Sequence, residues 1–98
     1  MAYIIETRYK EGSDDVFAEC RPQHLEYLTE NIDKILAGGA LLDDAGTSPH
    51  GGVIILDTDD REEAEDFIAN DPFNRGGLFE SVTVTRWRKA FFNFERLV

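Results

Sequence analysis

The 98-residue sequence contains one cysteine, one tryptophan and three prolines, and its basic residues are half as numerous as its acidic ones. A single cysteine, Cys20, excludes an internal disulfide. The first residues have neither the basic start nor the apolar length of a signal peptide, so we expect a cytoplasmic protein. Ten bases against twenty acids give a formal charge of −10, which repels phosphate backbones and anionic lipid surfaces. Nucleic acid and membranes are therefore not expected as partners.

What the sequence does contain is the balance of an ordinary globular domain, with 42% hydrophobic and 31% charged residues. Its length allows one hydrophobic core and not two. We expect a single domain over residues 1–98 that ends in an aromatic tail at residues 90–98. Four of the ten bases lie at residues 86–96, while the acids crowd into residues 11–30 and 57–71. This asymmetry is typical of solvated faces, and a dedicated anion site is the alternative.

The first half of the chain predicts a strand and a helix. β-Branched and aromatic residues at positions 2–9 predict the strand, and turn-forming residues follow. Apolar residues then recur at spacings of three, four and seven, which predicts an amphipathic helix with the stripe Leu25, Leu28, Ile32, Ile35 and Leu36. Gly38-Gly39 ends it as a C-cap. Pro22 fits its first turn, since an interior proline loses a backbone bond, and residues 16–20 then form a separate helical turn.

The second half predicts two strands, a helix and a final strand. Residues 40–44 form a short strand, a loop rich in glycine follows, and residues 53–56 form a strand that is apolar on both faces. Asp59 or Asp60 caps the second helix, which stops near Asn70-Asp71 because Pro72 follows. The last strand, residues 79–87, alternates Val82 and Val84 with Ser81, Thr83 and Thr85.

This order of elements is β-α-β-β-α-β, which predicts a ferredoxin-like α+β fold: a four-stranded antiparallel sheet with two helices on one face. The other face then lacks a cover, although one strand is apolar on both sides. Phe91, Phe92 and Phe94 beyond the last strand would also be an exposed apolar patch on a monomer. We therefore predict a homodimer whose sheets pack face to face into an α+β barrel, with the tail across the joint.

Two residues far apart in sequence are the candidates for chemistry. His24 falls at the edge of the first helix's apolar stripe, where an imidazole can exchange protons near neutral pH, and the alternative is a structural histidine. Asp71 follows the second helix, where a carboxylate meets the negative end of the helix dipole and needs compensation. It either accepts backbone N–H bonds in an Asx turn or pairs with His24, which would fix the imidazole tautomer and raise its basicity.

Five short motifs carry a resemblance to a known family. They are Arg-Pro-Gln-His-Leu at residues 21–25, Gly-Gly before Leu-Leu, Gly-Gly-Val-Ile-Ile-Leu at 51–56, Asp-Pro-Phe at 71–73 and Ser-Val-Thr-Val at 81–84. In this pattern the chain resembles the YciI-like (YCII-related) family from about residue 3 to residue 89. The resemblance implies a dimeric α+β barrel related to muconolactone isomerases, a His–Asp active site that maps to His24 and Asp71, and a branch that includes a dehydrochlorinase. The tail after Lys89 is longer and more aromatic than the family pattern, and could cap the pocket.

The substrate-binding candidates are Arg21, as the partner of a substrate anion, and Tyr3 and Phe73, as pocket walls. Cys20 is interpreted as structural because Glu19 and the negative net charge do not favour a thiolate, and His50 as a solvated loop residue. Two histidines and one cysteine lack metal-ligand spacing, and no glycine-rich loop fits a phosphate. No metal or cofactor is therefore expected.

Three functions remain open. The first is a cofactor-free isomerase, lyase or dehydrochlorinase-like enzyme, in which His24 and Asp71 move a proton on a small cyclic or aromatic-derived organic acid or lactone. The second is a non-catalytic ligand-binding or dimerisation module that serves a metabolic pathway. The third is a haem-handling barrel, with His24 as axial ligand.

Overall fold

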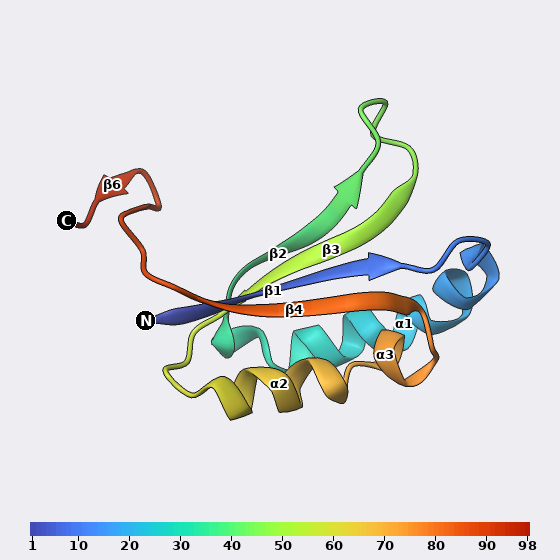
Figure 1. The fold of residues 1–98 in the computed structure, drawn as a ribbon, viewed down its shortest axis with the longest axis horizontal. Helices are drawn as coiled ribbons and strands as arrows, with labels where there is room; N and C mark the ends of the chain where they lie inside the picture. The colour runs from blue at the N-terminus through green and yellow to red at the C-terminus, as the bar shows by residue number, and fades with distance from the viewer.

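The computed structural model describes residues 1–98 as one four-stranded antiparallel sheet with its helices on one face (Figure 1). The strand order is β2-β3-β1-β4, and a separate two-stranded hairpin ends the chain. The elements in chain order are β1 (Ala2–Tyr9), α1 (Asp14–Glu30), the 3₁₀ turn η1 (Ile32–Lys34), β2 (Ile35–Leu42), β3 (Pro49–Leu56), α2 (Arg61–Ala69), α3 (Pro72–Arg75), β4 (Phe79–Trp87), β5 (Phe91–Phe92) and β6 (Glu95–Arg96). The predicted β-α-β-β-α-β fold is confirmed, with the short helix α3 and the C-terminal hairpin added to it.

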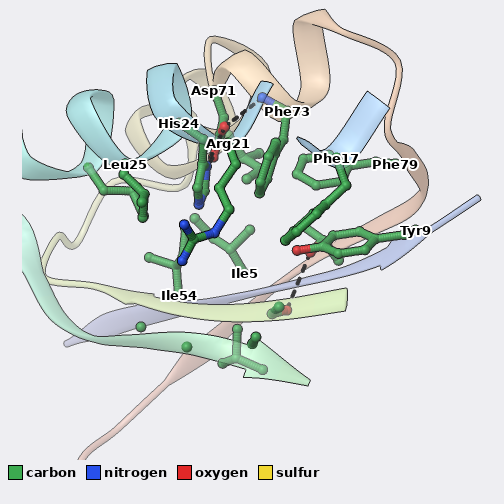
Figure 2. Close-up of a pocket in the computed structure, with 18 residues that line it drawn as sticks. Ile5, Tyr9, Phe17, Arg21, His24, Leu25, Ile54, Asp71, Phe73 and Phe79 are labelled. Carbon is green, nitrogen blue, oxygen red and sulfur yellow. Dashed lines mark hydrogen bonds and ion pairs between the residues drawn. The ribbon is translucent and has the colours of Figure 1, made fainter. Parts of the chain in front are cut away.

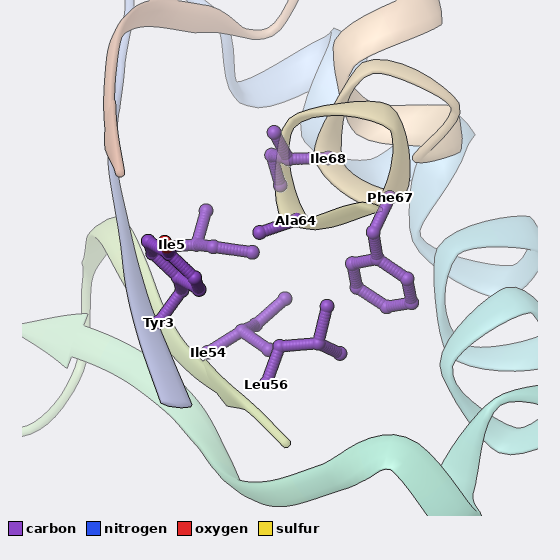
Figure 3. Close-up of a cluster of buried hydrophobic side chains, with 7 residues drawn as sticks. All are labelled: Tyr3, Ile5, Ile54, Leu56, Ala64, Phe67 and Ile68. Atoms are coloured by element: carbon purple, nitrogen blue, oxygen red, sulfur yellow. The ribbon is translucent and has the colours of Figure 1, made fainter. Parts of the chain in front are cut away.

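The core lies between α2 and the centre of the sheet (Figure 3). Alternate residues of β1 point toward the helices, and the register places Tyr3 opposite Leu56 and Ile5 opposite Ile54 of β3. Helix α2 packs its apolar stripe on them, and the seven residues of the cluster are Tyr3, Ile5, Ile54, Leu56, Ala64, Phe67 and Ile68. Asp60 is the cap of α2, because its side chain accepts the backbone N–H of Glu62 at 3.0 Å.

Helix α1 is longer at its start and shorter at its end than predicted. It runs without a break from Asp14 through Pro22 to Glu30, so residues 16–20 are part of it and not a separate turn. Pro22 has no N–H for the carbonyl of Ala18, but both residues are exposed, and water can solvate that carbonyl. No residue of α1 is buried. The helix therefore lies against the rest of the protein without forming part of the closed core.

The predicted C-cap at Gly38-Gly39 is wrong, because both glycines lie inside strand β2. The helix ends instead at Glu30, and its C-cap is Asn31, whose backbone N–H donates to the carbonyl of Leu28 at 3.1 Å. Only η1 separates the helix from β2, so the apolar spacing continues from helix into strand. Strand β3 also begins earlier than predicted, at Pro49. Gly51 is required there, since a β-carbon on it would overlap the carbonyl oxygen of Thr7 in the neighbouring strand.

Two surfaces of the chain have no cover. The sheet face opposite the helices carries the alternate residues of β1, among them Ile4, which pairs with Ile55. The C-terminal hairpin extends away from the body (Figure 1). It turns at Asn93 and Phe94, whose φ angles of 54° and 63° are those of a two-residue type I′ hairpin turn. The predicted dimer would cover these surfaces, and the single chain does not test it. No helix has the length and apolar character needed to cross a membrane.

Candidate active site

A cavity of about 240 Å³ lies between α1 and the sheet (Figure 2). Its floor comes from β1, β2 and β3 and includes Gly38 and Gly52, which have no side chains to fill it. Aromatic rings from several elements form its walls, and α1 contributes His24 and Arg21. No side chain of α1 is fully buried, and its inward-facing residues, among them Phe17 and Leu28, line the cavity.

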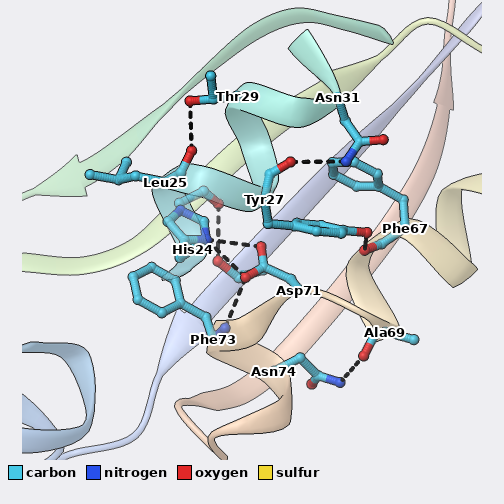
Figure 4. A network of polar contacts seen from close by, with 12 residues as sticks. His24, Leu25, Tyr27, Thr29, Asn31, Phe67, Ala69, Asp71, Phe73 and Asn74 are labelled. Carbon is cyan, nitrogen blue, oxygen red and sulfur yellow. Dashed lines mark hydrogen bonds and ion pairs between the residues drawn. The ribbon is translucent and has the colours of Figure 1, made fainter. Parts of the chain in front are cut away.

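His24 and Asp71 form a hydrogen-bonded pair at this cavity (Figure 4). The imidazole Nδ1 lies 2.8 Å from Oδ1 and 3.0 Å from Oδ2 of the carboxylate. The Asp71 side chain is fully buried, whereas the His24 side chain is 14% exposed. An ionised carboxylate only accepts, so Nδ1 carries the proton, and in a neutral imidazole Nε2 then keeps its lone pair on the cavity side. The predicted contact is confirmed; its use in catalysis stays a prediction.

Asp71 combines both roles that the sequence left open. Its Oδ1 accepts the backbone N–H of Phe73 at 2.8 Å as well as the imidazole N–H. Helix α2 has already ended at Ala69, and Asp71 is the N-cap of α3. The carboxylate therefore lies beyond the C-terminal end of α2 and also at the start of α3. There the backbone N–H groups of α3 stabilise its negative charge. These bonds fix the carboxylate relative to the histidine.

The ring of Phe73 packs on one face of the imidazole. Its ring stacks on that of His24 with centroids 3.8 Å apart and planes 11° from parallel. Phe73 is only 3% exposed and lines the cavity, as predicted. Hydrogen bonds to Asp71 and stacking on Phe73 therefore restrict the histidine in two directions.

Arg21 lies one turn before His24 on the same side of α1. Its guanidinium points into the cavity beneath the imidazole (Figure 2). The residue is exposed, and none of the ion pairs within the chain involves it. The cavity thus contains a cation without an ion-pair partner in the chain, and the binding of a substrate anion by Arg21 stays a prediction.

Comparison with known proteins assigns the chain to a family. A family model described as the YCII-related domain matches residues 1–88. The chain is a YCII-related domain. None of the curated proteins matches it.

Two solved structures resemble this YCII-related domain. One is 5-chloro-2-hydroxyhydroquinone dehydrochlorinase (TftG) from Burkholderia phenoliruptrix AC1100 in complex with 2,5-dihydroxybenzoquinone. It has 33% identity and a TM-score of 0.82, over 90% of this chain and 94% of the other. The other, an antibiotic biosynthesis monooxygenase, has 18% identity and a TM-score of 0.51, over 91% of this chain and all of the other. The second likeness concerns the fold alone.

Tyr3 does not belong to the site of this YCII-related domain, although the sequence suggested it as a pocket wall. It is 3% exposed, lies in the hydrophobic core and is not among the residues that line the cavity. Its hydroxyl accepts a hydrogen bond from Arg86 Nη1 at 3.2 Å. The prediction failed because β1 is long: Tyr3 and Tyr9, six residues apart in one strand, are separated by about 20 Å.

Tyr9 is the residue that the sequence reasoning missed. It lines the cavity from the end of β1, and its hydroxyl points inward (Figure 2). Burial raises the pKa of the Tyr9 hydroxyl, and the negative charge of Asp71 raises it further. The alternation of β1 contained the signal, because Tyr9 shares the odd-numbered face of Ile5 and Thr7.

The other polar candidates serve the scaffold of this YCII-related domain. Cys20 is a half-buried free thiol that packs against Gly76, where a β-carbon would overlap its sulfur. His50 is exposed but not simply solvated, which corrects the sequence interpretation. Its Nε2 lies 3.2 Å from the carbonyl of Leu42, and its Nδ1 lies 3.3 Å from the Arg8 guanidinium.

Proposed function

We propose that this protein is a small-molecule enzyme in which His24, oriented by Asp71, removes a proton from a hydroxylated six-membered ring. The observation that carries the proposal is the free Nε2 of an imidazole whose Nδ1 is bound to a buried carboxylate at the edge of a cavity. The likeness to a dehydrochlorinase at 33% identity over most of both chains supports the same reaction class, elimination of hydrogen chloride. The residues themselves need no cofactor for such a proton transfer.

The size and lining of the cavity support a single substituted ring as substrate. An apolar cavity of about 150 Å³ is known to bind benzene, and the volume here is about 240 Å³. The additional space suits hydroxyl, oxo or chloro substituents. The aromatic walls favour a planar ring, and the Arg21 guanidinium favours an oxyanion on it. Hydroxylated chlorophenols and the acids or lactones related to them combine these properties.

The elimination balances without an oxidant or reductant. A proton shift from one ring hydroxyl to the carbon bearing chlorine makes that carbon tetrahedral. Nε2 of His24 then takes the proton of a second hydroxyl, whose electron pair forms a C=O bond while the adjacent double bond shifts and chlorine leaves as chloride. The imidazolium, stabilised by Asp71, returns its proton to solvent. The sum is loss of one proton and one chloride ion, with a quinone as product.

The test is chloride release from 5-chloro-2-hydroxyhydroquinone under anaerobic conditions, measured for the wild-type protein and for His24→Ala. We expect the variant to lose turnover by about 10²–10⁴-fold, the usual contribution of a positioned base, and to keep its fold. His50→Ala is the matched control, because His50 lies outside the cavity. Full activity in His24→Ala would refute the proposal. Binding of 2,5-dihydroxybenzoquinone without any turnover by the wild type would favour a non-catalytic binding module instead.

We further propose that the protein acts as a homodimer, paired through the uncovered face of its sheet. Ile4, Val53 and Ile55 lie on that face and are only half-buried in the single chain. Phe91 and Phe94 of the C-terminal hairpin are exposed and add further apolar surface. Light scattering at micromolar concentration should give twice the chain mass of 11.1 kDa, and Ile55→Asp should halve it. A monomeric wild type would contradict the dimer.

The proposed compartment is the cytoplasm, where a thiol such as that of Cys20 stays reduced.

A further inference from the structure

We propose that Tyr9 is the hydrogen-bond donor of this site: its neutral hydroxyl binds the ring oxygen on which negative charge builds while His24 takes the proton. This inference rests on the proposed function and adds a second residue that contacts the substrate. Charge that develops on an oxygen is stabilised most by a donor fixed in place before the reaction. Three features of the structure give Tyr9 that property.

The first feature is that packing fixes the ring and leaves its hydroxyl end free. Tyr9 lies among three phenylalanines, with centroids 5.7 Å from Phe17, 5.9 Å from Phe73 and 6.1 Å from Phe79. The Phe79 ring is stacked on it, 14° from parallel. Phe73 also stacks on His24, so one ring supports both polar groups. In Figure 2 the Tyr9 oxygen points into the space beneath His24 and Arg21.

The second feature is that the chain supplies no partner for this hydroxyl. Opposite it lies Gly52, on which a β-carbon would come within 3.9 Å of the Tyr9 oxygen. The carbonyl of Gly52 is bonded by the Thr7 hydroxyl at 3.4 Å. Tyr9 is half-buried, and its hydroxyl borders the cavity. Here glycine keeps the space open, and a bound ligand can fill it.

The third feature is the protonation state of the hydroxyl. Burial and the charge of Asp71 raise the pKa of Tyr9 above its ordinary value of 10.0, so the hydroxyl stays protonated and remains a donor at neutral pH. Asp71 therefore acts on both sides of the cavity. It fixes the proton of His24 on Nδ1 and disfavours ionisation of Tyr9.

The experiment compares Tyr9→Phe with Tyr27→Phe. Tyr9→Phe keeps the aromatic packing and removes only the hydroxyl. Tyr27 is the matched control: its hydroxyl donates to the carbonyl of Phe67 at 2.8 Å, and the residue does not line the cavity. We expect kcat for chloride release to fall about 10²-fold in Tyr9→Phe, and binding of 2,5-dihydroxybenzoquinone to weaken about tenfold. Tyr27→Phe should stay within threefold of wild type in both measurements.

The outcomes separate this inference from the function on which it rests. If His24→Ala is inactive and Tyr9→Phe stays within threefold of wild type in kcat and in quinone affinity, Tyr9 is not the donor and the proposed function stands. If His24→Ala keeps full activity, the proposed function fails first. A wild type that neither releases chloride nor binds the quinone overturns the substrate class and the role of Tyr9 together.

Discussion

Replacing Asp71 by asparagine separates the two contacts that this carboxylate makes. Asparagine is as good an N-cap as aspartate, so its oxygen can still accept the N–H of Phe73, now bonded at 2.8 Å. Its amide NH₂ then takes the place of Oδ2, which lies 3.0 Å from Nδ1 of His24, and donates where that oxygen accepted. When the imidazole accepts from this NH₂, it carries its proton on Nε2 instead, and the lone pair that faces the cavity is lost.

The expected cost is large for activity and small for stability. An asparagine that forces the wrong tautomer on a catalytic histidine can lower kcat by about 10⁴-fold, and we expect a loss of about 10²–10⁴-fold here. The free energy of unfolding should fall by no more than about 1 kcal/mol, since the cap remains. Asp71→Ala is the contrast. It removes the cap and leaves a buried N–H unpaired, and should cost about 2–4 kcal/mol.

Three measurements decide the outcome: chloride release, urea unfolding, and long-range ¹H–¹⁵N correlation spectra that report the tautomer of His24. We expect Asp71→Asn to unfold like the wild type, to show the proton on Nε2 and to be nearly inactive. If Asp71→Asn keeps activity within threefold of wild type, the pair does not orient a base and the mechanism is wrong. If it unfolds as easily as Asp71→Ala, the cap is not retained.

Three further predictions concern the scaffold. Asp60→Ala should lower the free energy of unfolding by about 1 kcal/mol through loss of the α2 cap, measured by urea titration. Gly51→Ala should cost about 1–3 kcal/mol, since its β-carbon would push against the backbone of Thr7. Tyr27 has a pKa raised by burial and by the charge of Asp71, so its neutral form stabilises the fold below pH 10 and this contribution is lost as the pH rises above 10. Tyr27→Phe should therefore be less stable at pH 8 but lose less stability between pH 9 and pH 11.

Each of these has a contradicting result. Unfolding midpoints equal to wild type for Asp60→Ala or Gly51→Ala would show that the cap or the close strand contact is not needed. An alkaline loss of stability that is the same in Tyr27→Phe and wild type would assign that loss to other groups.

The sequence predicted the sheet better than the first helix, for a physical reason. The alternation of apolar and polar residues in β1 and in β4 is a property of each strand alone. The cap of α2 is likewise local to that helix, so local rules predict these features directly. Ile35 fits the helical stripe equally well as a strand residue, because only Asn31 and the three residues of η1 intervene between α1 and β2. The glycines at 38 and 39 resemble a helix end, but their place was decided by pairing with β3. Such tertiary pairing cannot be read from a single segment.

For the site, the sequence supplied the chemistry and the structure supplied the distances. His24 and Asp71 could be paired because the predicted helix that carries His24 and the one that Asp71 follows share one face of the sheet. The sequence pattern favours Tyr3 over Tyr9 because it does not show how far along β1 the cavity lies. The double use of Asp71 also required coordinates, since the Asx turn and the ion pair each looked sufficient alone. Burial of the carboxylate makes both necessary.

The floor of the cavity and its reacting groups are on different segments of the chain. Gly38 and Gly52 belong to the β2–β3 hairpin, whereas the base and its carboxylate belong to α1 and to the start of α3. A β-carbon on Gly38 would meet only ordinary contacts, 3.7 to 3.9 Å away. Replacing Gly38 by residues of increasing size should therefore narrow the cavity and select smaller rings, while His24 and Asp71 stay unchanged. Selectivity and reactivity in this scaffold can be engineered, and can evolve, as independent traits.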